Sequence, residues 1–237
     1  MKLRTVALGL VVGAASVGVG LAVGMWSRGY SVKDMADMAS TYVEAKRSQH
    51  SVADRVRDIE ARKPELKEIA RAAGGKLRIL AFKKERRIEV HAPGWEAPRE
   101  YAMLGFSGTL GPKLQEGDMQ IPEGIYGISY LNPNSKFHLS LKVSYPNASD
   151  RARAKKDNRT DLGGDIMIHG KNVTIGCIPI GDAAIEEVFY LAAAVGIGNV
   201  SVVIAPYDMR AGRTAELEKS PLDWYPALCD EIAAALK

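Results

Sequence analysis

From Lys76 onward the chain alternates short apolar and polar runs, as strands that are buried on one face do. The runs at 77–82 and 87–91 flank a polar turn and predict a β-hairpin. Glycine and proline residues separate the later runs, which predict strands at 100–105, 124–131, 137–144, 165–169, 177–180 and 200–205. The pattern therefore predicts a mainly β (α+β) domain, a sandwich or barrel with flanking helices.

Helical spacing replaces this pattern in the preceding region, residues 31–75. An apolar stripe comprises Met35, Met38, Tyr42 and Val43. The segment Ser51-Val52-Ala53-Asp54 resembles a capping box, and Pro64 is placed to start a further helix that stops at Gly74-Gly75. We expect residues 31–75 to form a helical stalk or a cap on the following domain.

Two more helices are expected later in the chain. Asp182 is the expected N-cap of the first, whose apolar face comprises Ile185, Val188, Phe189 and Ala192. The second lies at the C-terminus, where Tyr225, Leu228, Ile232 and Leu236 recur at helical spacing. Cys229 falls inside that helix, so we expect it to pack in the core.

The N-terminus carries a targeting segment. Lys2 and Arg4 precede an uncharged run of 22 residues from Thr5 to Trp26, which is long enough to span a bilayer as a helix. We favour an uncleaved anchor in the inner membrane. A cleaved signal peptide is the alternative, because small residues stand at Ala22 and Gly24. Either interpretation predicts an exported protein.

The net charge of +4 excludes little by itself. Lys2, Arg4 and Arg28 supply three of these charges before any acidic residue, so the rest of the chain is close to neutral. We therefore expect no nucleic-acid-binding face. Basic runs at 83–87 and 151–156 are typical of solvated faces, and less often of contact with an anionic wall polymer or a membrane surface.

The strongest candidate for chemistry is the segment 168–180, where His169 and Cys177 stand eight residues apart. A cysteine becomes a nucleophile when a neighbouring base takes its proton, and an imidazole can do so near neutral pH. Spacing alone is weak evidence, since most such pairs are core or surface residues. A metal site is not expected, because zinc takes three or four ligands and only these two are close in sequence.

The full string of residues is more specific. It resembles the L,D-transpeptidase catalytic domain (YkuD-type), whose signature is His-Gly, a loop, and then Ser/Thr-x-Gly-Cys. Here these positions are His169-Gly170 and Thr174-Ile175-Gly176-Cys177. Flanking segments at 110–118, 122–128, 132–135, 137–141, 145–147 and 164–168 resemble the YafK/ErfK-type branch. The resemblance covers roughly 76–206 and implies a YkuD-like catalytic fold.

The resemblance also implies roles. Cys177 would attack a carbonyl of a peptidoglycan stem peptide, and His169 would act as general base and then general acid. Gly170 would orient the imidazole through its carbonyl, and Thr174 fills the Ser/Thr position. The backbone N–H groups of Gly176 and Cys177 are candidates for the oxyanion hole. No cofactor is required, and the reaction would serve cell-wall biogenesis and cell shape in the periplasm.

Two departures keep a second reaction open. Many family members have a histidine where this chain has Ile175, and an arginine where it has Pro179. An arginine is a natural partner for a stem carboxylate. An L,D-specific hydrolase that cuts a stem or a wall-linked protein is therefore the alternative to a transpeptidase. A wall-binding scaffold with an inactive site is a third hypothesis.

Other residues near the motif have weaker assignments. His138 shares an expected strand face with Ser140 and Lys142, so His138 and Ser140 are possible substrate contacts. Asp165 shares one expected strand face with His169 and is a possible acid that supports the site without contacting substrate. A disulfide between Cys177 and Cys229 would consume the nucleophile, so we do not favour it.

These patterns divide the chain into four regions. They are an N-terminal membrane anchor or signal segment (1–30), a helical stalk or cap (31–75), an L,D-transpeptidase catalytic domain (76–207) and a C-terminal helical extension (208–237). Peptidoglycan stem peptides are the expected partners, with the membrane through the first region and a wall-linked protein as a further possible substrate.

Overall fold

The structure is a computed structural model and describes residues 49–214 and 220–237 of the 237-residue chain. The predicted anchor or signal segment at 1–30 and the apolar stripe at residues 35–43 lie outside the described residues. Among the residues that are described, no helix has the length and apolar character needed to cross a membrane.

The described residues form one eight-stranded sheet in the order β3-β2-β1-β8-β4-β5-β6-β7. The strands are β1 Leu77–Phe82, β2 Arg87–His91, β3 Arg99–Ala102, β4 Gly124–Asn132, β5 Ser140–Val143, β6 Met167–His169, β7 Ile178–Pro179 and β8 Val200–Ala205. Two neighbouring pairs, β1–β8 and β6–β7, are parallel, and the other pairs are antiparallel. The predicted hairpin of residues 77–82 and 87–91 is confirmed.

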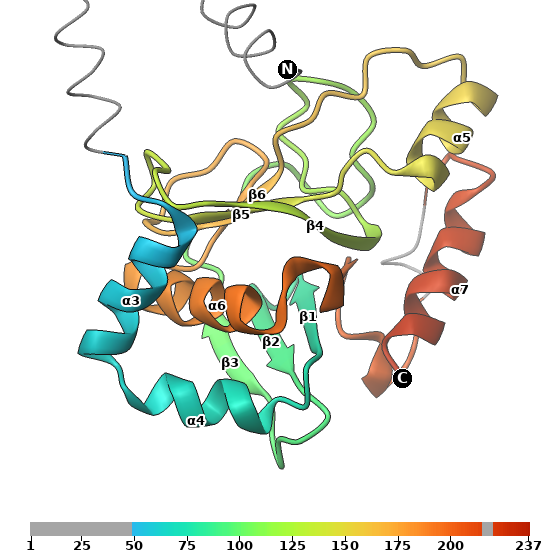
Figure 1. Ribbon diagram of the computed structural model, residues 1–237. Helices are drawn as coiled ribbons and strands as arrows, with labels where there is room; N and C mark the ends of the chain where they lie inside the picture. The colour runs from blue at the N-terminus through green and yellow to red at the C-terminus, as the bar shows by residue number, and fades with distance from the viewer. Residues whose placement is uncertain (1–48, 215–219) are drawn as a thin grey trace, which may run out of the picture. The chain divides into compact units, whose positions relative to one another are not determined.

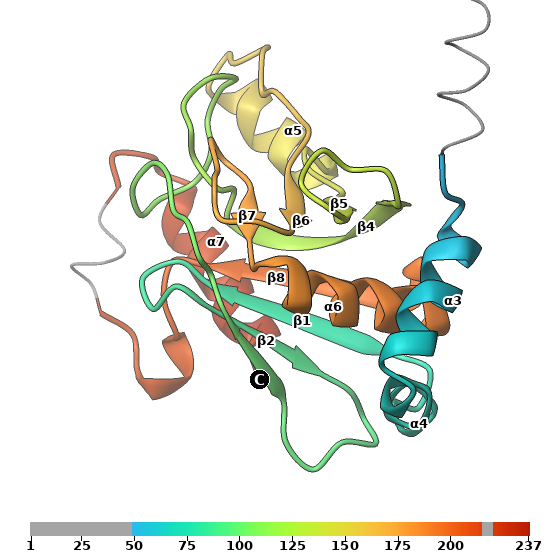
Figure 2. The ribbon, with the colours of Figure 1, turned by 90° about the vertical axis from the view of Figure 1, so that its left-hand side faces the viewer.

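The sheet curls because β4 belongs to both of its halves. The first part of β4, Gly124–Gly127, pairs with β8. Its second part, from Ile128 to Asn132, pairs with β5, and the register of that pairing shifts between Ile128 and Tyr130. The two halves enclose helix α6 (Asp182–Val195), which lies between β1–β2 and β4–β5–β6 in Figures 1 and 2. The prediction of a mainly β domain is confirmed. The strands form a single curled sheet instead of the predicted sandwich or barrel.

Helix α6 fills the space inside the curl. Its buried residues include Ile185, Val188, Phe189 and Ala192, as the sequence pattern predicts. The predicted N-cap is wrong by one position. Gly181, with φ 84°, is the N-cap, and the carboxylate of Asp182 instead accepts the N–H of Lys171 at 2.8 Å.

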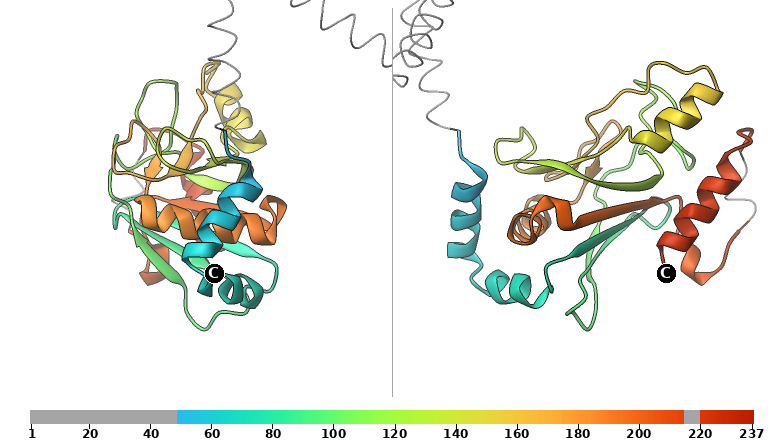
Figure 3. Two further views of the ribbon diagram at one scale, coloured as in Figure 1. Left: turned by 60° about the vertical axis from the view of Figure 1, so that its left-hand side comes forward. Right: turned by 45° about the vertical axis from the view of Figure 1, so that its right-hand side comes forward.

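Helices α3 (Val52–Arg62) and α4 (Glu65–Ala72) pack against α6 (Figure 1; Figure 3, left). The capping box of Ser51 and Asp54 that starts α3 is confirmed. Ile59 and Leu66 are each only 1% exposed, so these helices belong to the main core. The described part of the predicted stalk or cap therefore lies against the domain as a cap.

The opposite face of β1 and β8 is covered by helix α7 (Tyr225–Ala235), shown in red in Figure 3. Leu80, Phe82 and Val203 of the sheet pack there with Leu228 and Ile232. Cys229 is fully buried in α7, as expected, and no disulfide joins it to Cys177. The remaining helices are α5 (Ala148–Lys156), η1 (Ile197–Asn199) and η2 (Met209–Ala211).

A buried ion pair ties the long loop between β3 and β4 to this layer. The ammonium of Lys83, which follows β1, lies 2.8 Å from Oε1 of Glu123 and also donates to the carbonyls of Gly111 and Ile121. Both side chains of the pair are completely buried. The Tyr225 hydroxyl of α7 donates to the second oxygen of Glu123 at 2.7 Å. The loop that carries residues 111–121 is thus anchored to β1 and α7.

Candidate active site

His169 ends strand β6, and Cys177 stands immediately before strand β7. The two strands are parallel neighbours, with Ile168 opposite Ile178 and His169 opposite Pro179. Ile168 and Ile178 are fully buried and point into the core. Since side chains alternate along a strand, His169 and Cys177 lie on the other face of the sheet. Both side chains line one cleft of about 650 Å³.

The imidazole of His169 is buried and held in one orientation. Its Nδ1 lies 2.5 Å from the carbonyl oxygen of Gly170. A carbonyl only accepts, so Nδ1 carries the proton and Nε2 is left as the acceptor. The ring of Phe137 lies against the imidazole, with 4.6 Å between centroids. The Gly170 carbonyl is therefore the hydrogen-bond partner of the ring, and the role predicted for it in catalysis stays a prediction.

Burial lowers the pKa of His169, and its hydrogen bond with Gly170 offsets part of that shift. Burial also raises the pKa of the Cys177 thiol, while the positive charges of Lys142 and Lys113 oppose part of the rise. The thiol donates to the carbonyl oxygen of Asp165 at 3.4 Å. At neutral pH the cleft is therefore lined by a neutral thiol and a neutral imidazole. A neutral imidazole is the form that accepts a proton.

Thr174 fixes the turn before Cys177. Its Oγ1 accepts the N–H groups of Gly176 at 3.2 Å and Cys177 at 2.7 Å, and it donates to the carbonyl of Cys177 at 2.8 Å. Gly176 adopts a φ of 122°, which favours glycine. The two N–H groups expected to form an oxyanion hole are thus already bonded to Thr174 in this structure.

The cleft has an apolar rim and includes one nearly buried lysine. Four of its lining residues are large exposed apolar side chains, namely Met119, Phe137, Val173 and Ile175. Lys113 also lines the cleft and is nearly buried, with its ammonium 2.6 Å from a carboxylate oxygen of Asp118. Sequence reasoning missed Lys113, because its distance from the motif gives no local signal.

His138 was predicted to contact substrate, but it does not line the cleft. Strand β5 begins only at Ser140, since His138 adopts a φ of 75°, which is incompatible with an extended strand. The backbone there turns the imidazole toward α6, where Nε2 lies 3.0 Å from Oε1 of Glu186. Ser140 is buried opposite His169 in the sheet and does not line the cleft.

Asp165 also differs from its expected place. It has a φ of 51° and precedes β6, so it does not share a strand face with His169. Its side chain is 91% exposed, and its carboxylate lies 3.4 Å from the ammonium of Lys142. It therefore lies at the mouth of the cleft instead of behind the imidazole.

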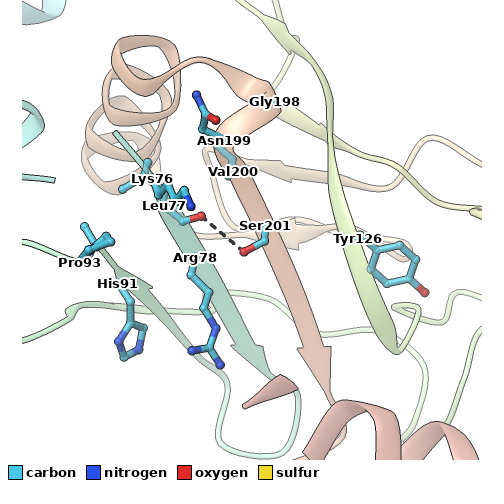
Figure 4. Close-up of a pocket in the computed structure, with 11 residues that line it drawn as sticks. Lys76, Leu77, Arg78, His91, Pro93, Tyr126, Gly198, Asn199, Val200 and Ser201 are labelled. Atoms are coloured by element: carbon cyan, nitrogen blue, oxygen red, sulfur yellow. Dashed lines mark hydrogen bonds between the residues drawn. The ribbon is translucent and has the colours of Figure 1, made fainter. Parts of the chain in front are cut away.

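A separate pocket of about 540 Å³ lies at the amino-terminal ends of β1 and β8 (Figure 4). Arg78 and His91 line it, but both have structural partners. Arg78 donates to the carbonyl of Ala235 in α7, and His91 lies 2.8 Å from a carboxylate oxygen of Glu89. Neither His169 nor Cys177 borders this pocket, so it is not the candidate active site.

Comparison with known families agrees with the geometry. The family model described as the L,D-transpeptidase catalytic domain (YkuD) matches residues 76–204, more than half of the chain. The chain belongs to the L,D-transpeptidase catalytic domain family. The predicted resemblance to that family is therefore confirmed.

YafK of Escherichia coli, whose name assigns it to the L,D-transpeptidases, is 33% identical to this chain over 143 residues. The same match is found for strain K12 and for strain O157:H7. It covers 58% of this chain and 56% of the relative, so the chain spans about half the length of these curated relatives. The predicted YafK/ErfK-like branch is supported by this match.

Solved structures are more distant. The helical cell shape determining protein Pgp2 of Campylobacter jejuni shares 24% identity with a TM-score of 0.44, over 56% of this chain and 48% of that one. L,D-transpeptidase 1 of Mycobacterium tuberculosis shares 15% identity with a TM-score of 0.32, over 55% and 62%.

Proposed function

We propose that this L,D-transpeptidase-family chain is a cysteine-dependent transpeptidase acting on peptidoglycan stem peptides in the periplasm. The observation that carries the proposal is the position of His169 and Cys177 on one face of adjacent strands, opening into one cleft. Family membership over residues 76–204 supports the same reaction class.

In the first half of the reaction, Sγ of Cys177 gives its proton to Nε2 of His169 and attacks the carbonyl carbon at the L-centre of a donor tetrapeptide. The carbon–nitrogen bond to D-alanine then breaks. D-Alanine leaves as an amine that receives the proton from His169, and the donor remains as a thioester on Cys177. The bond from Nδ1 to Gly170 keeps Nε2 directed at this exchange.

In the second half, the amine of a second stem attacks the thioester carbon while His169 accepts its proton. The carbon–sulfur bond breaks, the crosslink forms, and the proton returns to Cys177. The negative charge that develops on the carbonyl oxygen must be stabilised by hydrogen-bond donors. The N–H groups of Gly176 and Cys177 would serve if Thr174 rotates about χ1, because its Oγ1 now accepts both.

Hydrolysis is the second candidate reaction, in which water attacks the thioester. Pro179 is buried in β7, so no cation from that position reaches a stem carboxylate. Ile175 is 83% exposed at the rim and brings no charge either. A substrate held differently, such as a stem joined to a wall-linked protein, favours this alternative. Lys113 lines the cleft, but its ammonium is already paired with Asp118, so it does not replace the missing arginine.

The decisive experiment uses the purified full-length chain with disaccharide–tetrapeptide muropeptides and mass spectrometry. A crosslinked dimer with loss of D-alanine would support transpeptidation, and a shortened stem without dimer would support hydrolysis. Cys177→Ala should abolish either product, whereas Cys229→Ala, the matched cysteine control, should retain it. If neither product forms and iodoacetamide alkylates Cys177 no faster than an ordinary thiol, the inactive scaffold becomes the better account.

Export is proposed from the uncharged run at residues 5–26. Proteinase added to spheroplasts should then digest the catalytic domain without lysis. Carbonate extraction separates the two forms, because an uncleaved anchor stays with the membrane pellet and a cleaved product is released. Protection of the domain in intact spheroplasts would contradict export.

A further inference from the structure

A second groove, of about 790 Å³, adjoins the candidate active site. Its lining residues come from helix α5 and from the segment 158–163. That segment is part of the connection from α5 to β6, which can be followed in Figure 2. Glu116 and Gly163 line both this groove and the cleft that holds Cys177. The two hollows are therefore neighbours along one surface, with Glu116 and Gly163 at their junction.

The groove is lined by cations from α5 and from the segment that follows it. Arg151, Lys155 and Arg159 line it. Arg159 is held by Asp157 at 2.8 Å and by the carbonyl of Leu114 at 2.8 Å. Arg151 donates to the carbonyl of Asn147 at 3.1 Å. Lys155 is exposed and has no ion pair within the part of the chain that the structure describes, so it is available to a ligand.

Two carboxylates, Glu116 and Asp161, also line the groove. Glu116 stands at the junction with the cleft, exposed, with its backbone against Gly163. Gly163 has a φ of 68°, and a Cβ there would lie 3.1 Å from Cα of Glu116, so this approach needs glycine. Asp161 is also exposed in the lining. The groove is thus lined by the ammonium of Lys155 on α5 and by the carboxylate of Glu116 at its junction with the cleft that holds Cys177.

We propose that this groove binds a second peptide chain of the substrate, one that carries both free carboxylates and a free amine. The inference rests on the proposed function, because it concerns the chain that does not acylate Cys177. Its carboxylate would lie against Lys155, and its amine would lie toward Glu116, at the edge of the cleft. This orientation presents the amine end to the thioester carbon. The basic run at 151–156 thereby acquires a role beyond solvation.

The chain itself supplies a matched control. Lys155 and Lys156 are adjacent, both exposed and both on α5, but only Lys155 lines the groove. Lys155→Glu and Lys156→Glu change the net charge equally. A general electrostatic attraction would respond to both substitutions alike, whereas a bound carboxylate at the groove would respond to the first.

Binding is measured on full-length Cys177→Ala by amide chemical shifts, using a synthetic stem tripeptide with free carboxylates. We expect shifts at residues 151–163. Lys155→Glu should weaken the Kd read from those residues about five- to tenfold, since reversing a charge removes one exposed pair and adds repulsion. Lys156→Glu should leave it unchanged. Amidation of the peptide carboxylates should weaken binding as Lys155→Glu does.

Equal weakening by both substitutions, or no shifts at residues 151–163, would overturn the proposal. Acyl-enzyme formation on the chain with Cys177 intact is followed separately by intact-mass spectrometry. Loss of acylation in every variant would refute the proposed function, whereas normal acylation with no groove shifts would refute only this inference.

Discussion

The ring of Phe137 lies on the imidazole of His169, with centroids 4.6 Å apart and planes inclined by 34°. The next residue, His138, is held at 3.0 Å by Glu186 of α6, and the same carboxylate receives two bonds from Arg62 of α3. The loop between β4 and β5 is therefore fixed from beneath by two helices. This fixed loop presses an aromatic ring against the candidate general base.

Phe137→Ala should slow turnover and move its pH dependence. An aromatic pair contributes about 0.5–1.5 kcal/mol beyond burial, so we expect a loss of up to about tenfold in kcat. Burial lowers the pKa of His169, and exposing the ring should let that pKa rise toward its ordinary value. The acidic limb of the kcat profile should then shift to higher pH. Phe137→Tyr should preserve the wild-type limb, and an unshifted limb in the alanine variant would contradict the argument.

Stability should depend on pH through the same imidazole. The pKa of His169 is lower in the folded protein than its unfolded value of about 6.5, so the folded state binds fewer protons in that range. The stabilisation is complete above about pH 6.5 and is lost as pH falls toward the folded pKa. Urea unfolding at pH 7 and pH 5 should show a smaller loss for His169→Gln than for wild type. Equal losses would contradict this.

Cys177 should make the unfolding free energy depend on pH in the alkaline range. Its thiol pKa is raised by burial, so its contribution is present below the unfolded value of about 8.5 and is lost as pH rises through the folded pKa. Cys177→Ser should therefore flatten the decline of unfolding free energy between pH 8 and pH 10. Cys229→Ser is the comparison for simple loss of a thiol, and an unchanged slope in Cys177→Ser would refute the assignment.

Thr174→Val should loosen the turn that carries Cys177. The substitution removes three hydrogen bonds made by Oγ1, two of them to the N–H groups of Gly176 and Cys177. We expect a loss of about 1–3 kcal/mol in unfolding free energy, measured by urea titration, and a lower kcat. Thr174→Ser keeps the oxygen and should keep both properties. A valine variant as stable as the serine variant would show that these bonds contribute little.

Lys83→Met should be among the most destabilising single changes in the chain. It leaves the carboxylate of Glu123 fully buried without its cation, which costs about 3–5 kcal/mol. Adding Glu123→Gln should recover part of the loss, because the uncompensated charge disappears. Thermal unfolding of the single and double variants measures this coupling. Additive losses would mean that the two side chains act independently.

Much of the fold could be predicted from local pattern. The hairpin of β1 and β2, strand β8 and the apolar face of α6 each follow from the spacing of neighbouring residues. The sheet order could not, since the pairing of β8 with both β1 and β4 joins segments far apart in the chain. The short strands β5 and β6 were overestimated, because positive φ angles at His138 and Asp165 interrupt extended backbone.

The candidate site shows the same division. The His169 to Cys177 segment was identified because the motif is contiguous, and the proposed roles of both residues remain predictions. Lys113 was missed, since it reaches the cleft from a loop more than fifty residues away. His138 was misplaced because an apolar alternation suggested a strand face, whereas its bond to Glu186 depends on a helix that follows later.

The packing of α3 and α4 on α6 decides where a stable fragment of the protein can begin. The family match begins at residue 76, and a fragment started there would lack Ile59 and Leu66. Such a fragment would expose an apolar strip of α6 to solvent and would leave Glu186 without its partner Arg62. It should precipitate or bind a hydrophobic dye during expression. A fragment that begins near residue 49, ahead of the Ser51 cap, keeps that surface of α6 covered. It is the truncated form to express first.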